Sequence, residues 1–216
     1  IGLGKLKKRG AKVIGVNPIR TGYNAIADDW VGITPGTDGL FILSLVHILM
    51  AAGKIDLEYL IRYTNAPYLI DSDPKSETFG LFLRDNAGEP LILDRITKKA
   101  IAWNTKGAKP DLAGSYRRGG VSHLSVFQMI AERYLSEDYS PETVSKKVGI
   151  SADRIKGIAS ELARVAFEEE IVIEQEWTDF RGEKHDKMVG RPVSFHAMRG
   201  VSAHSNGFQT CRSLHL

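Results

Sequence analysis

The sequence lacks the disulfides and zinc-binding motifs that stabilise very small proteins, and it lacks the long apolar runs of membrane-spanning proteins. Its one cysteine, Cys211, excludes a disulfide within the chain, and no paired-cysteine spacing for zinc occurs. The most apolar run, residues 40–52, contains His47 and is shorter than the roughly 20 residues that a membrane span needs. No apolar stretch follows the basic cluster in IGLGKLKKRG at the start. We therefore expect no transmembrane helix, no signal peptide and a reducing compartment.

An excess of charge of either sign is also missing. Lys and Arg number 29 against 26 Asp and Glu, and the resulting net charge of +3 is too weak for a nucleic-acid footprint. Common catalytic motifs are absent too: we find no GxSxG elbow, no GxxxxGKS/T phosphate loop and no GxGxxG after a strand. The sequence therefore predicts no nucleic-acid partner, no direct membrane insertion, and no catalytic or metal-ligating residue set of its own.

What the sequence does contain is average globular composition and an α/β order of elements. Hydrophobic residues at 43% and charged residues at 25% favour a folded domain over disorder or a coiled coil. The pattern predicts strands over residues 11–16 and 30–34, then a helix with Thr37 or Asp38 as its N-cap that Gly53 closes. A short helix over residues 57–63 follows Asp56, which completes an α/β signature.

The second half of the chain is expected to return to helices after a loop-rich insertion. Residues 67–120 are rich in Gly and Pro and predict an insertion with one hairpin. The remaining pattern predicts helices over residues 124–135, 141–149 and 155–167, strands over 171–174 and 193–198, and a last helix from Gly207. Because the chain begins at Ile1 and stops on an apolar helical period, we expect both ends to be cuts in a longer polypeptide.

Three loops after predicted strands carry the candidate site, because ligands of open α/β sheets bind outside the carboxyl ends of the strands. Asn17-Pro18-Ile19-Arg20 follows the first strand, and the alternative is a simple strand-ending turn. Gly36 precedes Asp38, whose carboxylate can either cap the helix or accept hydrogen bonds from a guanine edge.

The third loop, residues 198–207, follows the last predicted strand. Gly200 permits close backbone approach, and Ser202 and His204 supply hydrogen-bonding groups. The alternative is an ordinary strand-to-helix turn with His204 exposed. Residue chemistry alone leaves both interpretations open.

These blocks together resemble a known family. VIGVNPIRTGYNAIADDWVGITPGTDGLFILSLVHILMAAGKID resembles the strand, D/N-P-R, T, A-D, W, P-G-T-D and apolar-helix pattern of the molybdopterin-dependent oxidoreductases, the dimethyl sulfoxide reductase superfamily. VFQMIAERYLSEDYSPETVSKKVGISADRIKGIASELA is similar to that family's helical pair, and MRGVSAHSNGFQTCRSLHL to its G-x6-G-x4-R-x3-L element. The three blocks cover well over half of the chain.

The resemblance implies a Rossmann-like α/β domain with a doubly wound parallel sheet. Residues 1–216 would be a partial molybdopterin guanine dinucleotide-binding domain of a large catalytic subunit, holding one guanosine arm of the bis-dinucleotide cofactor with molybdenum or tungsten. Asn17, Pro18 and Arg20 would bind the nucleotide, with Asn17 and Pro18 at its ribose and base. Gly36 would line the guanine pocket and Asp38 would recognise guanine. Along the pterin and diphosphate the resemblance places three further residues: Gly200, Ser202 and His204.

Departures from the family pattern limit what this chain can do alone. Ala203 stands where members often have Gln, and the Cys cluster for an iron–sulfur centre and the residue that ligates the metal are missing. We expect the 4Fe-4S cluster in a part of the parent that precedes this sequence, and an inactive chain on its own. The implied partners are the other domains of the same polypeptide, an iron–sulfur electron-transfer subunit and, as an option, a membrane anchor subunit.

The parent would be an enzyme of two-electron chemistry on formate, nitrate or a sulfur oxyanion, and its iron–sulfur partner would carry the electrons away. Its HAMRGVSAHSNG segment looks closer to large subunits that act on sulfite or related anions. The cytoplasm is the expected compartment, with the periplasm as the alternative. The contrasting hypothesis is a stand-alone α/β binding or interaction module without a cofactor.

Overall fold

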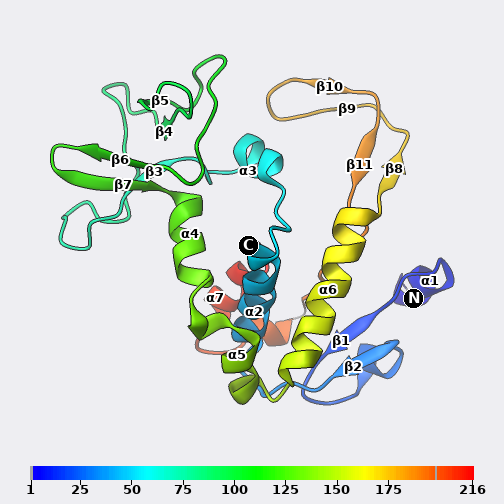
Figure 1. Ribbon diagram of the computed structural model, residues 1–216. Coiled ribbons are helices and arrows are strands. Elements are labelled where there is room, and N and C mark those ends of the chain that lie inside the picture. Colours follow the sequence, from blue (N-terminus) through cyan, green and yellow to red (C-terminus); the bar gives the residue numbers. More distant parts are fainter. Residues whose placement is uncertain (1, 198) are drawn as a thin grey trace. The chain divides into compact units, whose positions relative to one another are not determined.

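The computed structural model describes residues 2–197 and 199–216, and the chain divides into two compact units. The first unit combines the chain up to Lys54 with Glu137–Leu216, and the second is the continuous segment Ile55–Ser136 (Figure 1). Segments far apart in sequence therefore build the first unit together.

The first unit contains a parallel strand pair, a helical layer and two antiparallel ribbons. Its elements, in chain order, are α1 (Gly2–Lys8), β1 (Ile14–Val16), η1 (Gly22–Ala25), β2 (Asp29–Val31), α2 (Asp38–Ala51), η2 (Glu137–Tyr139), α5 (Pro141–Val148), α6 (Ala152–Glu168), β8 (Ile171–Ile173), β9 (Trp177–Thr178), β10 (Lys184–His185), β11 (Met188–Gly190), η3 (Arg199–Ser202) and α7 (Gly207–Ser213).

The core of this unit lies between the parallel pair and the helices. β1 pairs with β2 in register from Ile14↔Asp29 to Val16↔Val31. Helices α2, α5 and α6 pack on one another, and α6 is tied to β2 by an ion pair between Arg154 and Asp29. The buried members of this core come from β2, from the three helices and from the loops that follow β2 and α5: Val31, Ile33, Phe41, Leu45, Val144, Val148, Ile150, Ile155, Ile158 and Ala159.

Local signals define the helix ends of α5 and α6. The Ser140 side chain accepts a hydrogen bond from the Thr143 N–H, and Pro141 occupies the first helical turn, where its missing N–H costs nothing. Gly149 ends α5 in the left-handed region at φ 75°. Ser151 then caps α6 by accepting from the Arg154 N–H. The two predicted helices are confirmed.

The second unit is antiparallel. Its elements are α3 (Leu57–Tyr63), β3 (Leu69–Asp71), β4 (Leu91–Leu93), β5 (Ala100–Ala102), β6 (Ser115–Arg118), β7 (Val121–Ser125) and α4 (Val126–Tyr134). β7 lies between β3 and β6, while β4 pairs with β5. Leu69, Leu91 and Leu93 form its buried apolar centre. Two hairpins, β4–β5 and β6–β7, therefore form where the sequence predicted one. Residues 124–125 were expected in a helix, but they end β7 instead.

The α/β class is confirmed, but the structure does not show a Rossmann-like doubly wound parallel sheet. Among the described residues β1–β2 is the one parallel pair, and the other sheets are antiparallel. A doubly wound sheet needs successive crossovers to further parallel strands. Here the chain after α2 continues instead into the antiparallel second unit. Residues 193–197 of the last predicted strand do not form a strand, and residue 198 lies outside the described residues.

No helix in residues 2–197 and 199–216 combines the length and apolar character needed to cross a bilayer. The ribbon of β8 and β11 is exposed and apolar, with Ile171, Val172, Ile173 and Val189 each about half exposed. A two-stranded ribbon is marginally stable when it packs on nothing.

Candidate functional site

The loop after β1 begins at the carboxyl edge of the parallel pair. The Asn17 N–H continues the ladder by donating to the Val31 carbonyl over 3.1 Å. Its side-chain Oδ1 accepts from the Ile19 N–H at 3.1 Å, and its own carbonyl accepts from Trp30 Nε1 at 3.1 Å. Asn17 thus forms the strand-ending Asx turn that one interpretation predicted, and its side-chain NH₂ remains a donor group at the edge. Pro18 and Arg20 are exposed beyond it.

The loop after β2 reaches the start of α2 through a left-handed glycine. Gly36 has φ 80°, a conformation that residues with a Cβ rarely adopt. The Thr37 hydroxyl donates to the Thr34 carbonyl over 2.7 Å, so its side chain turns back into the loop. Thr37 occupies the N-cap position of α2 without making a side-chain capping bond.

Asp38 is the first residue of α2 and is half-buried. It lies one position after the N-cap, so the capping alternative is wrong for its side chain. Within the described part of the chain, its carboxylate has no hydrogen bond or ion pair. The first N–H groups of a helix have no partner inside the helix, and no side chain caps this one. The start of α2 therefore presents N–H donors beside a carboxylate acceptor.

The third predicted loop folds onto Gly36. The Asn206 side-chain NH₂ donates to the Gly36 carbonyl over 3.2 Å across 170 positions of sequence. A Cβ placed on Gly36 would lie 3.9 Å from His204 Nδ1. The turn is tight, because a Cβ on Gly207 would come within 2.1 Å of the Ser202 carbonyl oxygen. Two of the three predicted loops are thus in direct contact.

The other residues of the third loop line its exposed side. Gly200, Ser202 and His204 are exposed, and the Ser202 hydroxyl donates to the Arg199 carbonyl at 2.9 Å. Below the loop, helix α7 packs on α2, where a Cβ on Gly39 would lie 3.1 Å from the Thr210 hydroxyl.

The structure thus groups part of the predicted site. Gly36, Asp38 and His204 come together at the start of α2. Asn17 lies at the same edge of the parallel pair because β1 and β2 are in register. Sequence reasoning missed Asn206 as the residue that joins the loops. Its position before a helix was a sequence signal for a cap, but nothing local indicated a bond to Gly36.

Comparisons with known proteins show which proteins the chain is similar to. No protein-family model matches the chain. The chain is 41% identical to a sulfite dehydrogenase subunit of Allochromatium vinosum over 98% of its length and 23% of the relative. It is 29% identical to the formate dehydrogenase major subunit of Haemophilus influenzae over 74% of its length and 15% of that protein. It is 27% identical to the nitrate reductase alpha chain of Bacillus subtilis over 50% of its length and 10% of that protein.

The family resemblance is thereby confirmed. The chain is homologous to part of the catalytic subunits of the molybdopterin-dependent oxidoreductases, the dimethyl sulfoxide reductase superfamily. Within that class, the match to the sulfite dehydrogenase protein is the most extensive of the three. The chain spans about a quarter of that relative's length, 23%, and smaller shares of the other two.

Proposed function

We propose that this chain is a cofactor-binding part of a molybdenum or tungsten oxidoreductase catalytic subunit, and that its first unit holds one guanosine arm of a bis(molybdopterin guanine dinucleotide). The observation that carries the proposal is the docking of the 199–206 turn on Gly36 at the start of α2. This contact brings together two segments that lie at opposite ends of the sequence and that both match the family's nucleotide-binding pattern.

The residues at this place fit a guanine nucleotide. The Asp38 carboxylate offers two acceptor oxygens to the N1–H and N2–H₂ donors of a guanine edge. The uncapped N–H groups of α2 favour a negatively charged or electron-rich group nearby. Gly36 leaves room for a flat base, since a side chain there would project toward His204. The carboxylate acceptor and the N–H donors at the start of α2 therefore suit guanine, the base that the family resemblance implies.

The remaining residues have proposed positions around the same arm. Asn17 and Pro18 lie at the ribose and base, and the exposed Arg20 guanidinium suits a phosphate. Gly200, Ser202 and His204 lie along the pterin and diphosphate. Ala203 offers no polar contact where Gln is frequent in the family. The cofactor supplies two-electron redox chemistry at its metal when bound, and this chain's residues position it.

The whole parent protein is proposed to be larger and to act with other subunits. Its substrate class is a small anion such as formate, nitrate or a sulfur oxyanion, and the 41% identity to a sulfite dehydrogenase protein favours the sulfur oxyanion.

We propose a 4Fe-4S cluster outside this sequence, a partner subunit with iron–sulfur centres, and a cytoplasmic location. Residues 1–216 would be inactive alone, with residues 67–120 as an insertion. The β1–β2 pair would join further parallel strands of the parent to form a doubly wound sheet.

Nucleotide binding by the chain tests this proposal. We expect GDP to bind more tightly than ADP, and Asp38→Asn to remove that preference, because one carboxylate oxygen becomes an NH₂ that faces guanine donors. A hydrogen bond to a charged group contributes about 1.5–3 kcal/mol, which corresponds to roughly tenfold or more in affinity. Isothermal titration with GDP and ADP measures the ratio.

Asp153→Asn is the matched control, because Asp153 occupies the first turn of α6 as Asp38 does in α2. Both variants lose a similar favourable charge–dipole term of about 0.3–1 kcal/mol in stability. Only Asp38→Asn should change the GDP-to-ADP ratio. A wild-type chain without preference for GDP, or equal effects of the two variants on binding, would favour the stand-alone module instead.

A further inference from the structure

The β9–β10 hairpin of the first unit carries a cluster of three possible metal ligands that the nucleotide site does not use. β9 and β10 pair antiparallel, with His185 opposite Trp177. The turn between them is closed by Asp179, whose Oδ1 accepts from the N–H groups of Arg181 and Glu183, each at 2.9 Å. Gly182 takes the left-handed conformation, φ 81°, that this turn requires.

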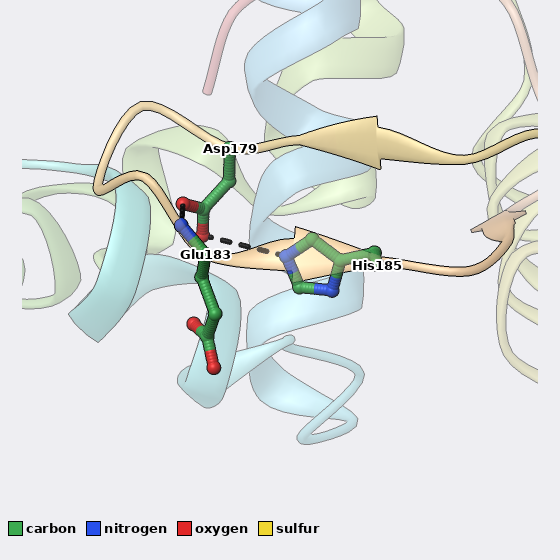
Figure 2. Close-up of side chains that lie close together, drawn as sticks. All are labelled: Asp179, Glu183 and His185. Atoms are coloured by element: carbon green, nitrogen blue, oxygen red, sulfur yellow. Dashed lines mark hydrogen bonds and ion pairs between the residues drawn. The ribbon is translucent and has the colours of Figure 1, made fainter.

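The side chains of Asp179 and His185 face each other on this hairpin, and that of Glu183 extends beside them (Figure 2). One ligand atom from each of Asp179, Glu183 and His185 lies within 4.8 Å of the other two. The Asp179 side chain is only 1% exposed, while that of His185 is 27% exposed and Glu183 reaches the surface. The cluster is therefore partly shielded and open to solvent on one side.

An imidazole nitrogen points into the cluster without a hydrogen-bond partner. His185 Nε2 lies 3.5 Å from Asp179 Oδ2, is buried, and makes no hydrogen bond to any described residue. A buried nitrogen without a partner costs free energy, which a bound ligand would recover. Figure 2 shows this nitrogen directed at the Asp179 carboxylate.

The imidazole is also held in place from its other side. The Trp177 indole stacks on it with ring centroids 4.5 Å apart and planes inclined by 19°. Trp177 Nε1 in turn donates to the Lys187 carbonyl over 3.1 Å, which fixes the indole. Such outer groups orient a ligating histidine and reduce the entropy that it loses on binding a metal.

The ligand set selects the class of ion. One imidazole nitrogen and two carboxylate oxygens suit Zn²⁺ and similar transition-metal ions, whereas Ca²⁺ and Mg²⁺ prefer oxygen ligands alone. Tetrahedral Zn²⁺ with bonds of about 2.0–2.2 Å needs its ligand atoms about 3.3–3.6 Å apart. The Nε2–Oδ2 separation of 3.5 Å already meets this spacing, and Glu183 offers a carboxylate oxygen within 4.8 Å of a ligand atom of each of the other two residues.

We propose that Asp179, Glu183 and His185 form a binding site for a transition-metal dication of the Zn²⁺ type, with an open position toward solvent. The ion replaces the 3.5 Å contact between His185 Nε2 and Asp179 Oδ2 with direct bonds to both atoms. Three protein ligands leave the fourth tetrahedral position to water or to an outside ligand.

Titration of the whole chain with Zn²⁺ alone, monitored by competition with a chromophoric chelator, tests the site. We expect one Zn²⁺ per chain, and roughly tenfold or greater weakening in His185→Gln and in Asp179→Asn. Asp179→Asn keeps the Oδ1 acceptor that closes the turn. Ca²⁺ and Mg²⁺ should not compete. Co²⁺ in place of Zn²⁺ should give the visible absorption of a tetrahedral site, which provides a readout that does not depend on a variant.

His215→Gln is the matched control, because His215 is exposed and lies outside the cluster. Its affinity for Zn²⁺ should equal that of the wild type. The proposal is overturned if wild-type chain binds no Zn²⁺, if His185→Gln binds it as well as the wild type does, or if His215→Gln loses it. An effect of His185→Gln on hairpin stability without any effect on Zn²⁺ affinity would identify the cluster as an ion pair only. None of these outcomes bears on GDP binding at Asp38.

Discussion

Gly207 is the residue at which the candidate site tolerates least change. A Cβ there would lie 2.1 Å from the Ser202 carbonyl oxygen and 2.5 Å from its carbonyl carbon, so main chain must move to admit alanine. We expect Gly207→Ala to lower the free energy of unfolding by about 1–3 kcal/mol and to weaken GDP binding through displacement of the 199–206 turn. Urea unfolding and GDP titration measure the two effects.

Gly157→Ala is the control for that substitution, because Gly157 lies within α6 and no atom lies within 4 Å of its would-be Cβ. Alanine in a helix interior is favoured over glycine by about 0.5–1 kcal/mol, so this variant should be stabilised. Equal stability of the two alanine variants would contradict the tight packing of the turn.

Asp94 makes the second unit sensitive to acid. Hydrogen bonds from the Thr97 N–H, the Lys109 N–H and the Thr97 hydroxyl lower its pKa from 3.8 to about 2. Because the pKa is lower in the folded state, Asp94 stabilises the fold above its ordinary pKa of 3.8, and this contribution is lost as pH falls from there to about 2. The Asp94→Asn variant should be less stable than the wild type at neutral pH. Between pH 3.8 and about 2 it should lose less stability than the wild type does.

Part of the acid response should remain in that variant. The pKa of Asp71 is also lowered, by side-chain hydrogen bonds from Ser76 and Thr78. Glu77→Gln, at an exposed position, should leave the acid profile as in the wild type. Thermal unfolding as a function of pH measures all three proteins, and an Asp94→Asn profile parallel to the wild type would refute the assignment.

At the scale of elements, capping is the feature that fixes where α6 starts. Ser151 Oγ accepts from the Arg154 N–H over 3.3 Å and satisfies one of the free donors of the first turn. We expect Ser151→Ala to cost about 1 kcal/mol of stability. Ser160→Ala, on the exposed face of the same helix, should be neutral or slightly stabilising because alanine is the better helix former. Denaturant unfolding that ranks the two variants in the opposite order would exclude capping as the cause.

Elements with such local signals were predictable from the sequence. Asp56 before residues 57–63, Ser140-Pro141 and Gly149 each specify a helix end through interactions with the next few residues, and the structure places helix ends there. The start of α7 at Gly207 was also predicted correctly. Short-range hydrogen bonds decide these boundaries, so a single sequence contains the necessary information.

Elements that depend on distant partners were not predictable in the same way. β7 joins β3 to β6, and its residues 124–125 match a helical period, yet pairing with Leu69 and Ile70 makes them a strand. Residues 193–197 have the composition of a strand but do not form one. Likewise, no local signal predicts that Asn206 donates to Gly36, because that contact depends on how α2 and α7 pack.

At the scale of the whole molecule, the chain exposes an apolar ribbon and matches only part of each relative. The apolar residues of the β8–β11 ribbon are exposed, and a contiguous apolar surface of this kind usually contacts another protein surface. The relatives are several times longer than the segment that matches, since 23% of the sulfite dehydrogenase protein is covered. In the proposed parent, other domains of the same polypeptide would cover this ribbon.

The proposed oxidoreductase therefore makes a prediction about the native protein as isolated from its source. Its mass should be several times 23.9 kDa, and elemental analysis of the same sample should find molybdenum or tungsten together with iron. Both results are required jointly, because metal without the larger mass could come from adventitious ions and the larger mass without metal could be an unrelated assembly. A metal-free protein of 23.9 kDa would mean that this homologous domain exists without the family's redox chemistry, and GDP binding at Asp38 would then need another purpose.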